Sequence, residues 1–167
     1  MQLIKPTKKY EKSWDEALDE FRTEKQKGFW NWEKEPANLK KYIKTTQDNE
    51  IGKMLPQGWV SSTTYWLVDN GEFIGHVNIR HKLNDNLTKL GGHIGYYIRP
   101  TSRKKGYGTK ILELALLKAK DLGLQKVLVT CDESNIVSKK IIKKNKGQFQ
   151  SKVLGENGLK LRYWIEL

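Results

Sequence analysis

The sequence predicts one mixed α/β domain with a largely antiparallel sheet of about six to seven strands and about four flanking helices. Apolar residues change period along the chain in the order β-α-α-β-β-β-α-β-α-β-β, and the 167 residues suit a single domain, 1–167, without repeat or linker. The dipeptide Asn70-Gly71 marks a hairpin. Residues 92–132 read as strand, helix and strand, which predicts the parallel part of the sheet.

The first half of the chain predicts a short strand, two helices and a hairpin. Residues 3–7 form the strand, and Ser13 is expected to cap a helix over 13–26. A second helical pattern, 37–47, follows Pro36, and a loop follows it at 56–62. Strands rich in β-branched and aromatic residues then flank the hairpin turn, at 63–69 and 72–81.

The second half alternates strands and helices. After a loop at 82–91, a strand over 92–100 is stopped by Pro100. A helix over 106–122 ends at Gly123, and a buried strand follows at 126–132. Either Ser134 or Asn135 caps the next helix, and the chain ends in a hairpin that turns at 155–158. The apolar face of that last helix is expected to hold Ile136, Val137, Ile141 and Ile142.

The net charge of +12, from 31 basic and 19 acidic residues, favours a nucleic acid, an anionic surface or a polyanionic cofactor as partner. Basic residues cluster at 99–110, which has no acid, and at 139–146. No apolar run approaches the roughly 20 residues that span a bilayer, so no membrane partner is expected. The N-terminus lacks the apolar core of a signal peptide, and the single Cys131 excludes an intramolecular disulfide, which together favour the cytoplasm.

The segment Arg103-Lys104-Lys105-Gly106-Tyr107-Gly108-Thr109 joins a predicted strand to a predicted helix. A helix start has backbone N–H groups without partners, glycines let the backbone approach a ligand, and nearby cations attract anions. The segment therefore suits an anion such as a pyrophosphate. It lacks the third glycine of the dinucleotide fingerprint and the lysine spacing of a P-loop, so an ordinary solvated turn remains an alternative on these residues alone.

Residues 94–149 resemble the GNAT N-acetyltransferase superfamily. The family's central motif is matched by Ile98-Arg99-Pro100 followed by Arg103-x-x-Gly106-x-Gly108. Its next motif, a strand and then N-x-x-S/A, is matched by Asn135-x-x-Ser138. A final K-x-G element is partly matched at 144–149.

The resemblance implies that acetyl-CoA is the cofactor. Its pyrophosphate would lie on the backbone N–H groups of 104–109, and its pantetheine arm between two splayed strands, 92–100 and 126–132. Lys104, Lys105 and Lys139 would reach the phosphates, whereas a solvated helix face is expected for the other lysines near Lys139. The implied cofactor-binding residues are Tyr96, Tyr97, Ile98, Arg103, Lys104, Lys105, Gly106, Tyr107, Gly108, Thr109, Asn135 and Ser138.

Acetyl transfer to an amine requires that the ammonium lose a proton, and His93 is the predicted base because histidine titrates near neutral pH. A structural role for His93 is the alternative, and the other candidate bases are His76, His81, Asp132 and Glu133. The tyrosine that many family members carry seven residues after the motif asparagine is replaced here by Ile142. The remaining proton donors are Ser138, Tyr96, Tyr97 and solvent, or none.

The segment Gly28–Pro36 is rich in tryptophan and glutamate. In the resembled family the segment between the first two helices lines the acceptor site. Trp30, Trp32 and Glu33 are therefore predicted to bind the acceptor, with a separate hydrophobic cluster as the alternative.

The sequence as a whole predicts an acetyl-CoA-dependent N-acetyltransferase that acts by direct transfer on a primary amine of a small molecule or peptide. One alternative is a catalytically inert acyl-CoA sensor, because the base and the acid are uncertain. Another is a nucleic-acid-binding module, against which the aromatic residues do not interleave with the basic clusters. No metal site is expected, and a homodimer is compatible with the sequence.

Overall fold

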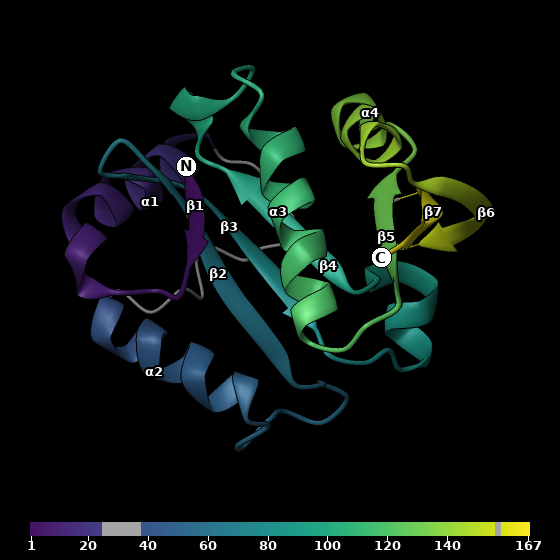
Figure 1. Cartoon of the computed structure of the whole chain (residues 1–167), viewed down its shortest axis with the longest axis horizontal. Helices are drawn as coiled ribbons and strands as arrows, with labels where there is room; N and C mark the ends of the chain where they lie inside the picture. The colour runs from purple at the N-terminus through teal and green to yellow at the C-terminus, as the bar shows by residue number, and fades with distance from the viewer. Residues whose placement is uncertain (25–37, 156–157) are drawn as a thin grey trace.

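The computed structural model describes residues 1–24, 38–155 and 158–167, which form two antiparallel sheets (Figure 1). The first sheet has the order β1-β2-β3-β4 and the second the order β5-β7-β6. Within each sheet neighbouring strands are antiparallel, as predicted. The prediction of one sheet is not matched, because the two strands expected to be its parallel pair, at 92–100 and 126–132, lie in different sheets. The strands are β1 (Gln2–Ile4), β2 (Ser62–Asp69), β3 (Glu72–Arg80), β4 (Ile94–Ile98), β5 (Lys126–Asp132), β6 (Gln148–Gly155) and β7 (Gly158–Glu166).

Four α-helices of the described chain cover the sheets: α1 (Glu11–Glu24), α2 (Leu39–Glu50), α3 (Tyr107–Asp121) and α4 (Ile136–Lys144). Successive strand residues point to opposite faces, so Trp66 and Leu67 enter different cores. Trp66 packs with the aromatic residues of α1 and α2, whereas Leu67 packs with the apolar stripe of α3. The first sheet is therefore covered on both faces (Figure 1).

The hairpin between β2 and β3 confirms the turn that the sequence predicts. Asn70 and Gly71 have φ values of 47° and 81°, the left-handed pair that a two-residue hairpin turn requires. A second predicted glycine position is also confirmed, at the C-terminal end of α3. Gly123 has a φ of 85° directly after the C-cap Leu122, as expected of a helix-ending glycine. No helix in the described part of the chain is long and apolar enough to cross a membrane.

The prediction that Ser13 caps the first helix is wrong. A 3-10 turn over Lys8–Tyr10, capped by Thr7, runs directly into α1 at Glu11. Ser13 lies inside the first turns of α1, and its hydroxyl accepts a hydrogen bond from the backbone N–H of Phe73 (3.0 Å). The side chain thus joins α1 to β3, a long-range contact that local sequence does not reveal.

Two further boundaries and one helix face differ from the predictions. The segment expected to be a loop at 82–91 ends in a π-helical turn over Leu87–Gly91, and the strand expected over 92–100 is shorter because Pro100–Ser102 form a 3-10 turn. Asn135, not Ser134, caps α4. Ile136 and Val137 of the predicted apolar face are 53% and 69% exposed, because α4 packs through its C-terminal half, where Ile142 is buried.

Candidate active site

A fork between β4 and β5 forms the centre of the candidate site. The carbonyl of His93 accepts from Arg80 of β3 (2.8 Å), while its N–H donates to the Leu128 carbonyl of β5 (2.7 Å). Beyond this point no backbone hydrogen bond joins the two strands within the described residues. Figure 1 shows β4 and β5 close together at their starts and apart at their ends.

The edge of β4 that faces the fork has open backbone groups. The N–H of Arg99 donates to Ile74 of β3 (2.9 Å), so odd-numbered residues of β4 pair with β3. By strand alternation, Tyr96 and Ile98 direct their N–H and C=O groups away from β3. Of these four groups, the Ile98 carbonyl accepts from Nε of Arg103 (3.2 Å), which leaves both groups of Tyr96 and the N–H of Ile98 for a ligand. An extended amide-containing chain could therefore pair with this edge as an added strand.

The loop before α3 forms a cradle of backbone N–H groups. Lys104 and Gly106 both have left-handed φ values, 61° and 85°, and such conformations turn successive N–H groups to one side. In the part of the chain that the structure describes, none of the five N–H groups from 104 to 108 has a hydrogen-bond acceptor. The amide of Thr109, which the sequence placed in the same cradle, already donates to the Gly106 carbonyl (3.1 Å).

The two motif glycines have different physical roles. A Cβ at Gly106 would meet no atom within 4 Å, so this glycine is needed for its left-handed backbone rather than for space. A Cβ at Gly108 would lie 2.7 Å from Cδ1 of Ile141, so this glycine lets α3 begin close against α4. Asn145 also ties α4 to the start of α3, by donating to the Thr109 carbonyl (3.2 Å).

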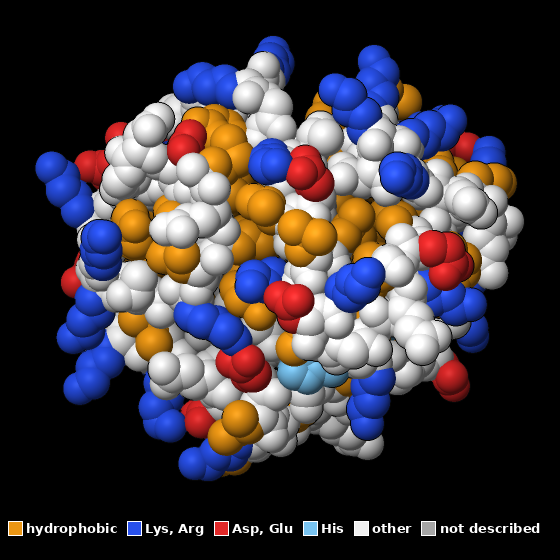
Figure 2. Space-filling model, in the orientation of Figure 1, with side chains coloured by type: hydrophobic (Ala, Val, Ile, Leu, Met, Phe, Trp, Pro, Cys, Tyr) orange, Lys and Arg blue, Asp and Glu red, His pale blue; other side chains and the backbone are white. Residues whose placement is uncertain are grey.

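Cations surround the cradle, but they are used differently. Lys104 and Lys105 are exposed and have no ion-pair partner among the described residues. Arg103 instead donates to the Ile98 carbonyl (3.2 Å) and to Glu24 of α1 (2.6 Å), so its guanidinium holds the loop in place. Figure 2 shows Lys and Arg side chains gathered above the loop and above α4.

The aromatic side chains of the motif point in three directions. The Tyr107 hydroxyl donates to Asp69 (2.9 Å), and Tyr97 packs edge-on against Phe21 of α1. Tyr96 alone crosses the fork, where its hydroxyl lies 3.3 Å from Oγ of Ser138 on α4. Burial raises the pKa of Tyr96 to about 12, so its hydroxyl keeps its proton at neutral pH.

The start of α4 closes the far side of the fork. The side chain of Asn135 accepts from the backbone N–H of Ser138 (2.9 Å), which orders the first turn of the helix. Ile142, at the position of the family tyrosine, is fully buried and supplies no proton donor. Cys131 is buried, and burial raises the pKa of its thiol, which disfavours a thiolate nucleophile.

The sequence did not single out a buried ion pair beside the cradle. Arg99 is 6% exposed and donates to Glu20 of α1 from Nε (3.0 Å) and Nη2 (2.5 Å), and to Ser13 (3.1 Å). Glu20 also accepts from the backbone N–H of Thr101 (3.1 Å). Burial acts to raise the pKa of Glu20, but the hydrogen bonds from Arg99 and Thr101 outweigh it and the pKa is lowered.

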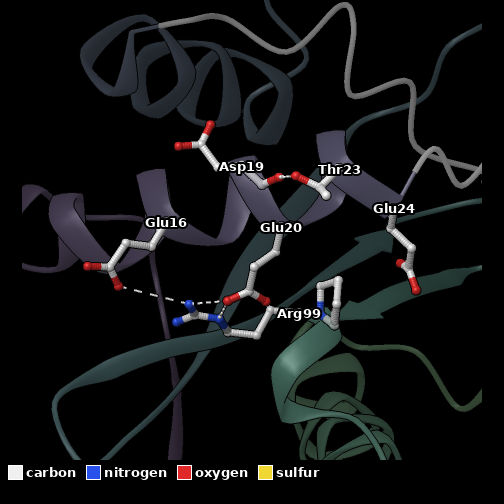
Figure 3. A pocket seen from close by; sticks show the side chains of 7 residues that line it. Glu16, Asp19, Glu20, Thr23, Glu24 and Arg99 are labelled. Atoms are coloured by element: carbon white, nitrogen blue, oxygen red, sulfur yellow. Dashed lines mark hydrogen bonds and ion pairs between the residues drawn. The ribbon is translucent and has the colours of Figure 1, made fainter.

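This pair lines a shallow hollow of about 750 Å³ between α1 and the Arg99–Pro100 corner (Figure 3). Its acids recur every four residues, at Glu16, Glu20 and Glu24, which places them on one face of α1. That spacing predicts a shared acidic face on the helix, but it does not specify which cations the face meets. Since Glu20 and Glu24 bind Arg99 and Arg103, we interpret this face as the support of the loop rather than as a free acidic site.

His93, the predicted base, lies at the apex of the fork and is buried. Its Nδ1 accepts the backbone N–H of Leu128 (2.9 Å). Burial, helped by the nearby charge of Arg80, lowers the pKa of His93 to about 4. His93 is therefore neutral at pH 7, and its catalytic role stays a prediction.

The other two histidines make hydrogen bonds with side chains. His76 is buried and its Nδ1 shares a hydrogen bond with the Tyr42 hydroxyl (2.9 Å), and burial lowers its pKa to about 3. Nε2 of His81 lies 2.8 Å from the Thr63 hydroxyl.

Trp30, Trp32 and Glu33 lie outside the described residues, so their predicted role at the acceptor site stays a prediction. Over the described ranges, no cluster of His, Cys, Asp and Glu suits a metal ion.

The two buried histidines predict acid destabilisation. Both have a lower pKa when folded than the unfolded value of 6.5, so between about pH 4 and 6.5 the unfolded chain binds more protons. Their contribution to stability is therefore complete above pH 6.5 and is lost as the pH falls toward 4, by up to about 1.4 kcal/mol per pH unit for each. Urea unfolding across this range measures the slope. His93→Asn should reduce the slope by the contribution of one titrating group. An unchanged slope would show that His93 does not contribute to the acid destabilisation.

The comparisons with known proteins agree with this geometry. The family model described as an acetyltransferase (GNAT) domain matches residues 9–148. No match was found among curated proteins. The chain belongs to the GNAT acetyltransferase family, and acetyl-CoA is the acetyl donor of these enzymes.

Solved structures share the fold at low identity. The microcin C7 self-immunity acetyltransferase MccE, in complex with acetyl-CoA and AMP, is 16% identical with a TM-score of 0.71, over 99% of this chain and 91% of that one. RimL, a ribosomal L7/L12 alpha-N-protein acetyltransferase in complex with coenzyme A, is 12% identical with a TM-score of 0.70, over 100% and 95%. The spermidine N-acetyltransferase SpeG from Vibrio cholerae is 12% identical with a TM-score of 0.67, over 99% and 95%.

The residues present fit this donor. Five unpaired N–H groups and two exposed lysines suit a pyrophosphate, and the open edge of β4 suits the amides of a pantetheine arm. The structure thus brings together, around one fork, the residues predicted from 96 to 109 and from 135 to 138. The side chains of Arg103, Tyr107 and Tyr97 turn away from it, so these residues would contribute mainly their backbone.

Proposed function

We propose that this protein acetylates a primary amine, on a small molecule or a peptide, by direct transfer from acetyl-CoA bound in the fork between β4 and β5. The observation that supports the placement most strongly is the row of five unpaired N–H groups at 104–108, directly beside the open edge of β4. Water can satisfy such exposed N–H groups, but five of them in a row at a helix start, next to two lysines, favour an anion.

Each part of the fork has a separate task in this proposal. The amides of the cradle, with Lys104 and Lys105, hold the phosphates, while Tyr96 and Ile98 pair with the pantetheine arm. Acetyl-CoA supplies the activated acetyl group. Asn135 and Ser138 order the opposite wall at the start of α4.

The acceptor must lose a proton before it can react, because a lysine-type amine has a pKa near 10.4. Tyr96 keeps its proton and is held by Ser138, so it is placed to donate a hydrogen bond within the fork rather than to accept a proton. Two of the candidate bases are carboxylates at the end of β5, and both are paired with lysines, Asp132 with Lys160 (2.7 Å) and Glu133 with Lys152. Among the described residues no carboxylate at the fork is thus left without a cation, so solvent is the simplest proton acceptor.

The acceptor class can be tested by following thiol release from acetyl-CoA with three amine panels: polyamines, amino acids and aminoglycosides, and peptides with a free N-terminus. We expect turnover with members of one panel and none with N-acetylated controls. SpeG and RimL act on a polyamine and on a protein N-terminus, so both panels have precedent in this fold.

One outcome would favour the alternative of an inert sensor. The full burial of Ile142, where many family members have a tyrosine, is the observation that keeps this alternative open. Tight binding of acetyl-CoA without thiol release from any panel would contradict the proposed transfer activity.

A further inference from the structure

We infer that His93 is a positioning residue, whose imidazole pins the apex of the fork and so sets the width of the cofactor slot. For its effect on affinity this inference rests on the proposed placement of acetyl-CoA. The hydrogen bond on which it depends can be tested without any cofactor.

The geometry at His93 is a two-point link between the sheets. The backbone N–H of His93 donates to the Leu128 carbonyl (2.7 Å), and Nδ1 of the same residue accepts the Leu128 N–H (2.9 Å). In a parallel ladder, the second bond would go to a backbone carbonyl. Here a side chain replaces that carbonyl, so the ladder can stop at this residue without leaving a buried N–H unsatisfied.

The residues around His93 leave it little freedom. A Cβ on Gly92 would lie 2.5 Å from the Leu128 carbonyl oxygen, so the backbone approaches β5 as closely as glycine allows. Arg80 donates to the Gly91 and Gly92 carbonyls (3.3 and 3.1 Å), and its backbone N–H donates to the His93 carbonyl. The backbone at His93 is thus fixed from β3, while the imidazole is held by the Leu128 N–H of β5 and lies beside Trp164 of β7, with 6.1 Å between the ring centroids.

The direction of the side-chain bond also fixes the proton on the imidazole. Because Nδ1 accepts from Leu128, a neutral His93 carries its proton on Nε2. Its one basic lone pair is therefore already used within the protein. This positioning role competes directly with the predicted role of His93 as general base, and the two roles use different ring nitrogens.

Two amide substitutions separate these roles. In His93→Asn, the side-chain oxygen lies where Nδ1 lay and can accept the Leu128 N–H, but no group remains at Nε2. In His93→Gln, the amide reaches the Nε2 position and leaves the Nδ1 position without an acceptor. His93→Ala removes both and is the reference for complete loss.

We expect the affinity for acetyl-CoA, measured by calorimetric titration, to fall about tenfold in His93→Gln and His93→Ala, which corresponds to the loss of one hydrogen bond. His93→Asn should stay within about threefold of the wild type. Turnover and KM should also stay near the wild-type values in His93→Asn and change in His93→Gln and His93→Ala. The pH profile of kcat in His93→Asn should match that of the wild type. If His93→Asn instead lost kcat as fully as His93→Ala, with affinity unchanged in both, the positioning role would be wrong and the base role right.

The hydrogen bond itself can be observed by NMR in the wild-type protein without cofactor. We expect a scalar coupling between the amide nitrogen of Leu128 and Nδ1 of His93, and amide hydrogen exchange of Leu128 about ten times faster in His93→Gln than in His93→Asn. Absence of the coupling would overturn the inference whether or not acetyl-CoA binds in the fork. If the coupling were present while variants of the cradle bound acetyl-CoA normally, the cofactor placement would fail instead.

Discussion

Replacing Glu20 with alanine is expected to lower the free energy of unfolding by about 3 kcal/mol, the largest stability effect that we predict for a single side chain. Arg99 is 6% exposed and depends on Glu20 for two of its hydrogen bonds. Without Glu20, a guanidinium would remain buried beside only the hydroxyl of Ser13 and the carbonyl of Phe73, with Glu16 3.9 Å away. Urea unfolding measures the loss.

Asp19 provides the matched control for this prediction. It lies on the same helix, but its side chain is 74% exposed and its ion-pair partner among the described residues is Arg22, one turn away. Asp19→Ala should change stability by less than about 0.5 kcal/mol. Combining Glu20→Ala with Arg99→Met should restore part of the loss, because the buried charge is then gone. Equal effects of Glu20→Ala and Asp19→Ala would show that the buried pair is unimportant.

Replacing Gly106 with valine is expected to weaken acetyl-CoA binding by at least about 100-fold. Gly106 has a φ of 85°, which a β-branched residue strongly disfavours, so the loop must rearrange and turn its N–H groups away from the anion. Losing two hydrogen bonds to a charged group accounts for a change of this size. Calorimetric titration with acetyl-CoA measures the effect.

The helix offers its own control at the opposite end. Gly123 also has a φ of 85°, and a Cβ there would also meet no atom within 4 Å. Gly123→Val should therefore cost similar backbone strain without changing acetyl-CoA binding, and Gly106→Asn should retain most of the affinity because asparagine tolerates this conformation. If Gly106→Val and Gly123→Val bound acetyl-CoA equally well, the cradle would not be the phosphate site.

Features set by local backbone chemistry could be predicted from the sequence. Asn70 and Gly71 have few alternatives to the hairpin turn that they form, and Gly123 ends α3 for the same steric reason. The cradle also belongs to this class, because glycines, cations and a helix start occur within seven consecutive residues. The acetyltransferase family was identified from motifs of this local kind and is confirmed.

Features set by long-range contacts could not be predicted. Ser13 was expected to cap a helix, but its hydroxyl instead accepts from Phe73, 60 residues along the chain. The ion pair between Glu20 and Arg99 depends on how α1 packs against the end of β4, which no local pattern specifies. The bond between Leu128 and His93 is similar, since an unpaired strand edge becomes visible only when both sheets are in place.

The most direct test of the account is to map the backbone amides that respond to acetyl-CoA by NMR titration of the wild-type protein. We expect the largest shifts at 104–108, followed by Tyr96, Ile98 and Ser138 around the fork. Small shifts are expected along the acidic face of α1, where Glu20 and Glu24 are already paired with arginines. If the amides of 104–108 did not move while another surface responded to saturating acetyl-CoA, the proposed cofactor site would be wrong.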